Sequence, residues 1–190
     1  MTLLLIVIYV AFIGLGVPDS LIGAAWPAIQ DELKLPLNAV SIITLLISGS
    51  TVLSSIFSAK ILNKLGTPIV TALSTVLTAV ALIGFSFSKN IFWMIPVAIA
   101  LGLGAGAIDA GLNNYVALHF SARHMNFLHC FYGIGVTLSP YLMSMAISSS
   151  GWRSGYIYAA IIQFAISLVI IISLPLWKKA KPMEIDEHEE

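Results

Sequence analysis

Apolar residues form six long runs along the chain, and short polar interruptions separate them. The hydrocarbon core of a bilayer is about 30 Å thick, so a helix that crosses it needs about 20 predominantly apolar residues. Each of the six runs reaches that length. The pattern therefore predicts six transmembrane helices, over residues 3–29, 39–61, 68–88, 91–118, 125–148 and 155–177.

The composition supports a protein surrounded by lipid. Of the 190 residues, 58% are hydrophobic and only 9% are charged, whereas a soluble domain carries about 25% charged residues. The formal net charge is zero, which argues against a nucleic acid as partner. Cys130 is the only cysteine, so an intrachain disulfide is excluded.

The six predicted helices divide into two similar blocks. The segment Gly14-Leu-Gly-Val-Pro-Asp19 in the first helix matches Gly104-Ala-Gly-Ala-Ile-Asp109 in the fourth, at an offset of 90 residues. Each block holds three spans, an odd number, so the second copy must enter the membrane upside down. An inverted 3+3 arrangement is typical of each six-helix half of a major facilitator transporter. We therefore expect a transmembrane domain over 1–177, with repeats 3–88 and 91–177, and a disordered acidic cytoplasmic tail over 178–190.

Two acidic residues, Asp19 and Asp109, lie inside the predicted spans, and no Lys or Arg lies in the middle of any span. A carboxylate near the bilayer centre costs about 2.5–3.5 kcal/mol on insertion scales, so its presence needs a reason. A carboxyl group in apolar surroundings without a basic partner is suited to loading and releasing a proton or binding a cation. The alternative is a neutral acid that hydrogen-bonds between helices. Because Asp19 follows Pro18, it is also a candidate cap for a helix restarted at a break.

Further polar residues lie close to Asp109. Asn113 lies four residues later and hence on the same helix face, and Asn114 lies beside it. Amides and a carboxylate together can bind sugar hydroxyls, although hydrogen bonding between helices is an equally good role for Asn114. His129 is a candidate for substrate binding or proton relay.

Metal binding and hydrolytic chemistry are not expected. His119, His124 and His129 recur every five residues, so successive side chains would point about 140° apart on a helix. No span combines a serine, a base and an orienting acid, so an enzyme is not expected, and neither is a cofactor.

Small residues predict close helix packing at two places. Ser50, Ser54 and Ser58 form a stripe on the second helix, and Gly102 and Gly106 form a GxxxG step on the fourth. The third and sixth helices contain no charged residue, so we expect them to face lipid while the first and fourth face a cavity.

The segments Gly106–Val116 and His124–Gly135 resemble the fucose–proton symporter family of the major facilitator superfamily. In that family an acid on the fourth helix is followed by an asparagine four residues later, and the fifth helix carries an asparagine with a polar residue three further on. Those positions here are Asp109, Asn113, Asn126 and His129, and Tyr132 belongs to the same segment. The acid on the family's first helix corresponds to Asp19. The resemblance implies uptake of a hexose-like sugar with protons, Asp19 and Asp109 being the proton-linked residues.

These observations predict the N-terminal half of a proton-coupled sugar symporter, paired with a second six-helix half or a second copy of itself. The alternatives are a proton-coupled exporter of amphipathic compounds and a non-transporting fragment. Orientation is predicted from the Lys and Arg residues in the connections and the tail, of which six fall on the side of the N-terminus and three on the other. This distribution favours cytoplasmic N- and C-termini in the plasma (inner) membrane.

Overall fold

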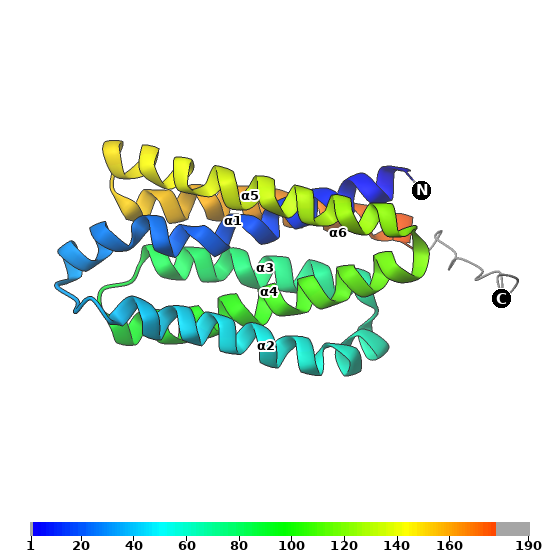
Figure 1. Ribbon diagram of the computed structural model, residues 1–190, viewed down its shortest axis with the longest axis horizontal. Helices are drawn as coiled ribbons and strands as arrows, with labels where there is room; N and C mark the ends of the chain where they lie inside the picture. The colour runs from blue at the N-terminus through cyan, green and yellow to red at the C-terminus, as the bar shows by residue number, and fades with distance from the viewer. Residues whose placement is uncertain (1, 178–190) are drawn as a thin grey trace, which may run out of the picture.

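The computed structural model describes residues 2–177, all of whose regular secondary structure is α-helical (Figure 1). The predicted tail, 178–190, lies outside the described residues. All six helices are long and apolar enough to cross a membrane, which confirms the predicted fold class. They are α1 (Thr2–Leu33), α2 (Ala39–Leu65), α3 (Thr67–Ser86), α4 (Ile91–His119), α5 (Ala122–Ser149) and α6 (Trp152–Trp177).

Several helices extend beyond the apolar runs that predicted them. α1 continues from the predicted end at 29 to Leu33, and Lys34 then adopts a left-handed φ of 52°. The N–H of Leu35 donates to the carbonyl of Gln30 at 3.2 Å, which closes the helix end. α1 also runs without a break through Pro18. The proposal that Asp19 caps a restarted helix is therefore wrong.

The helices pair across the two repeats. The most extensive contacts join α1 with α5 and α2 with α4. If the first three helices are exchanged with the last three, α1 takes the place of α4 and α5 takes the place of α2, so each pair maps onto the other. An inverted repeat requires this correspondence. In Figure 1 the start of α1, the end of α6 and the α2–α3 and α4–α5 connections lie at one end of the bundle.

The matched glycines occupy equivalent places in these contacts. Gly16 of α1 packs on the backbone of α5, and Gly106 of α4 packs on the backbone of α2. Gly14 and Gly104 pack on the third helix of the opposite repeat: Gly14 contacts side chains of α6, and Gly104 contacts the backbone and a side chain of α3. The sequence match at an offset of 90 residues thus corresponds to a structural equivalence.

α3 and α6 pack against each other through a polar seam. The Gln163 amide on α6 donates to the Thr78 hydroxyl on α3 at 2.8 Å, and both side chains are buried. The opposite faces carry exposed Leu, Ile and Val side chains. Both helices thus present an apolar face outward, as expected for contact with lipid.

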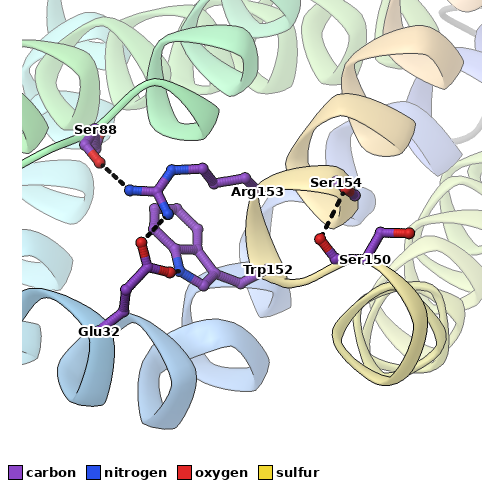
Figure 2. A network of polar contacts seen from close by, with 6 residues as sticks. All are labelled: Glu32, Ser88, Ser150, Trp152, Arg153 and Ser154. Carbon is purple, nitrogen blue, oxygen red and sulfur yellow. Dashed lines mark hydrogen bonds and ion pairs between the residues drawn. The ribbon is translucent and has the colours of Figure 1, made fainter.

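A cluster of polar contacts joins three connections at the end of the bundle opposite the N-terminus (Figure 2). Arg153, at the start of α6, pairs with Glu32 at the end of α1 and donates to the Ser88 carbonyl at 2.9 Å. The Trp152 indole N–H donates to the same Glu32 carboxylate at 2.7 Å, and the guanidinium lies 4.3 Å from the centre of the Trp152 ring. The cluster therefore ties the first repeat, the connection between repeats and the second repeat together.

Replacing Arg153 with alanine should lower stability by about 1–2 kcal/mol, because it removes a partly exposed ion pair, a hydrogen bond and a cation–π contact. Thermal unfolding in detergent measures the loss. Lys34→Ala is the matched control, since Lys34 pairs only with Asp31 and both side chains are more than 80% exposed. Equal unfolding temperatures for the two variants would contradict a stabilising role for the cluster.

Candidate functional site

A cavity of about 600 Å³ lies among α1, α2, α4 and α5. No residue of α3 or α6 lines it, in agreement with the predicted placement of these two helices on the outside. Most of the lining is apolar, from residues such as Phe12, Leu15 and Leu101. The polar lining residues are Asp19, Thr44, Ser48, Thr51, Asp109, His129 and Tyr132.

Asp19 reaches the cavity from the middle of α1 and is held by a residue of α5. The Tyr132 hydroxyl donates a hydrogen bond to the Asp19 carboxylate. The two helices come close enough for this contact because Gly16 and Gly135 let their backbones approach. Just beyond, the Ser20 hydroxyl donates to the Val136 carbonyl at 2.7 Å. Asp19 therefore sits beside a close and well-defined helix crossing.

Asp109 enters the same cavity from α4. The Asn113 amide, one turn later, donates to a carboxylate oxygen of Asp109 at 2.9 Å and to its main-chain carbonyl at 3.0 Å. These two bonds fix the orientation of the carboxyl group. The acids that match in the sequence repeat thus converge on one cavity from opposite repeats, and among residues 2–177 no Lys or Arg lines it.

Among the described residues, His129 of α5 is the one imidazole in the lining. Its ring meets the Phe12 ring edge to face, with the ring centres 6.3 Å apart. An imidazole can donate or accept a hydrogen bond, so it adds a further polar group beside the two acids. The cavity therefore contains two carboxyl groups, a phenol and an imidazole.

Sequence reasoning missed the hydroxyl groups of α2. Thr44 and Ser48 line the cavity, and within residues 2–177 their side chains form no hydrogen bond to another protein group. Thr51 also lines it, but its hydroxyl donates to the Ile47 and Gly102 carbonyls at 3.0 and 3.2 Å. Spacing of four and three residues places all three on one face. That spacing was a usable signal, hidden by the many other Ser and Thr residues of the same helix.

Three predicted substrate residues do not line the cavity. Asn113 contacts the cavity only through its hydrogen bond to Asp109. Asn114 is exposed and lies five residues after Asp109, which turns it about 140° away around α4. Asn126 is exposed near the start of α5, one turn before His129. The other histidines also lie elsewhere: His119 donates to the Tyr115 carbonyl at 2.9 Å, and His124 bonds the Tyr9 hydroxyl at 2.8 Å.

The predicted close packing between α2 and α4 is confirmed. A Cβ atom added at Gly102 or Gly106 would run into the carbonyl oxygens of Ile47 or Thr51 on α2. Ser50, Ser54 and Ser58 are all buried, and the Ser54 hydroxyl donates to the Leu103 carbonyl at 2.7 Å. The stripe of small residues thus holds α2 against α4, and both of these helices line the cavity.

Six apolar helices in inverted repeats around a central cavity that contains two acids define the class of secondary-transporter domains. The chain belongs to the Major Facilitator Superfamily, whose family model matches residues 4–189. This membership confirms the superfamily resemblance. Because this is a family of transporters, it also confirms the expectation that the chain is not an enzyme.

Two characterised relatives are similar to parts of the chain. The glucose/mannose transporter GlcP of Bacillus subtilis (strain 168) is 24% identical over 151 residues, covering 78% of this chain and 37% of that protein. The niacin transporter NiaP of Acinetobacter baylyi (strain ATCC 33305 / BD413 / ADP1) is 21% identical over 123 residues, covering 62% of this chain and 28% of that protein. The chain thus spans well under half the length of the relatives it matches.

Proposed function

We propose that this six-helix unit is one half of a proton-coupled symporter for a hexose-like sugar. The observation that carries the proposal is the convergence of Asp19 and Asp109 on one cavity that, within the part of the chain the structure describes, no Lys or Arg lines. A carboxyl group without a cationic partner can be neutral or charged, as a proton carrier must be. The similarity to a glucose/mannose transporter supports a sugar as the substrate.

In this proposal the polar residues divide into proton sites and sugar sites. Tyr132 and Asn113 donate to Asp19 and Asp109 and stabilise their charged forms, and these donors become available to a sugar when the acids are protonated. Thr44, Ser48 and His129 supply further donors and acceptors for sugar hydroxyls. Proton binding and sugar binding are coupled because the charged carboxylates and the sugar compete for the same hydrogen-bond donors, and protonation of the acids releases those donors. A role of Asn114 and Asn126 in sugar binding remains a prediction from the sequence alone.

The proposal includes a partner that covers the cavity. α2 and α5 line the cavity and also carry exposed apolar side chains, among them Leu45, Val52, Leu138, Tyr141 and Met145. A second six-helix half or a second copy of this chain would cover these faces and close the cavity between the two units. Cytoplasmic N- and C-termini and location in the plasma (inner) membrane belong to the same proposal.

The second relative raises niacin, an aromatic carboxylate, as another substrate. His129 and Phe12 would suit its charge and its ring. However, an anion entering this cavity would meet two carboxyl groups, and like charges in an apolar site repel strongly. A neutral sugar avoids that repulsion, so we favour the sugar.

Proteoliposomes containing the chain test the proposal. Adding a hexose outside should make the external medium more alkaline, because protons enter with the sugar. Adding nicotinate or an amphipathic cation should give no such signal. A proton movement in the opposite direction with an amphipathic compound would instead indicate an exporter. No substrate-dependent signal from the chain, alone or with a second half, would indicate a non-transporting fragment.

Tyr132→Phe should reduce the rate of sugar-driven proton uptake about tenfold, because it removes a hydrogen bond to a charged group while retaining the ring. Tyr158→Phe on α6 is the matched control, since Tyr158 is 41% exposed and does not line the cavity. A Tyr132→Phe rate equal to that of the control would show that the bond to Asp19 has no part in transport.

A further inference from the structure

A second hollow lies on the outer surface among α2, α3 and α4, and it shares no residue with the cavity. Its volume is about 470 Å³, and we call it the α2–α3 groove. Its walls are leucine, isoleucine and phenylalanine side chains of α2 and α3. Leu53, Phe57 and Leu73 are each more than half exposed, so the groove opens toward the surrounding bilayer.

The groove exists because α2 and α3 both pack on α4 and hardly touch each other. Gly102 and Gly106 bring α2 against one side of α4, and Gly104 brings α3 against another. The equivalent helices of the second repeat, α5 and α6, contact each other much more, with Gly155 packed on Met143 and Ala146. The packing that opens the groove thus differs between the two repeats.

The shape and lining of the groove suit an acyl chain. Leu53, Phe57, Ile61 and Leu65 recur every four residues along α2, so this wall is about 18 Å long. One leaflet of the hydrocarbon core is about 15 Å deep. Ser54 and Ser74 are the two polar residues of the lining, and the Ser54 hydroxyl is already bonded to the Leu103 carbonyl. The occupant must therefore be apolar over most of its length.

The end of the groove nearest the α2–α3 connection carries positive charge. Lys60 lies three residues after Phe57, and Lys64 lies three residues after Ile61. Each lysine is therefore about 60° around α2 from a residue that lines the groove. Both lysines are exposed, and among residues 2–177 neither takes part in an ion pair. A negatively charged group at the end of an acyl chain would meet them at the level of the lipid headgroups.

We propose that the α2–α3 groove binds one acyl chain of an anionic phospholipid, whose phosphate group pairs with Lys60 and Lys64. This site is separate from the cavity and does not depend on what the protein transports. It commits the groove to a lipid of the bilayer, because the length and apolar lining of the groove match an acyl chain and the charge at its end matches a phosphate group.

Native mass spectrometry of the full chain in detergent tests the charge requirement. Phosphatidylglycerol and phosphatidylcholine with identical acyl chains are added at equal concentrations. We expect preferential binding of phosphatidylglycerol, and a loss of about fivefold in its affinity for each lysine changed in Lys60→Gln and Lys64→Gln. Lys89→Gln, at the opposite end of the bundle, is the control and should change nothing.

A second variant tests the groove itself. Leu73→Trp should fill the groove and weaken the binding of phosphatidylglycerol while leaving both lysines in place. Leu168→Trp makes the same change on α6, where the leucine is 57% exposed compared with 59% for Leu73. Equal binding of the two lipids by the unchanged protein would overturn the proposal. The proposal would also be overturned if Lys89→Gln reduced the binding of phosphatidylglycerol as much as Lys60→Gln and Lys64→Gln do. The same holds if Leu73→Trp and Leu168→Trp reduced it equally.

Discussion

Asp109→Asn should reduce sugar-driven proton uptake to the level of protein-free liposomes. Asparagine has nearly the same shape as aspartate, and its side-chain oxygen can still accept the hydrogen bond from Asn113. The site would thus keep its geometry but lose the group that carries a proton. Exchange of labelled sugar across the membrane, which needs no net proton movement, should continue.

Measuring both activities in the same proteoliposomes separates loss of coupling from loss of folding. Asp31→Asn is the matched control, because Asp31 pairs with Lys34 at the exposed end of α1. Asp19→Asn should behave like Asp109→Asn if the two acids share the proton. Net sugar-driven proton uptake that persists in Asp109→Asn would show that Asp109 is not a proton carrier. Loss of both activities would assign it to sugar binding or to structure.

The sequence was informative where one physical requirement dominates. Crossing a bilayer demands about 20 apolar residues, so the existence of all six helices could be predicted from hydrophobicity alone. The cost of placing a charge in lipid singled out Asp19 and Asp109, and the structure brings them to one cavity. The glycine match at an offset of 90 residues predicted which helices correspond.

The features that depend on side-chain direction and on distant partners were not predictable in this way. The length criterion counts apolar residues, so it stopped at residue 29 although the polar residues after it continue the helix to Leu33. The pairing of Glu32 with Arg153 joins residues 121 positions apart and has no local signal. Thr44 and Ser48 could not be told from the other hydroxyl residues of α2, because nothing in the sequence shows which face meets the cavity.

Gly106→Leu should prevent stable folding, and Gly106→Ala should destabilise the protein by about 1–3 kcal/mol. A Cβ atom at this position would overlap the Thr51 carbonyl oxygen and lie 3.0 Å from the Ser54 Cβ. The obstacle is backbone, which cannot rotate aside as a side chain can, so α2 and α4 would have to separate. Thermal unfolding of the purified chain in detergent measures the change.

The inverted repeat makes a second, independent form of this prediction. Gly16 of α1 meets the Tyr132 carbonyl on α5 as Gly106 meets Thr51, so Gly16→Ala should destabilise the protein by a similar amount. Gly49 and Gly133 provide matched controls within α2 and α5, because a Cβ atom added at either would meet nothing within 4 Å. Alanine at these two positions should be neutral or stabilise the helix by up to about 1 kcal/mol.

If all four alanine variants unfolded at the same temperature, close backbone approach at Gly16 and Gly106 would not be what holds the two repeats together. If only the two crossing glycines are sensitive, the contacts that position Asp19 and Asp109 depend on the same small residues that the sequence repeat preserves.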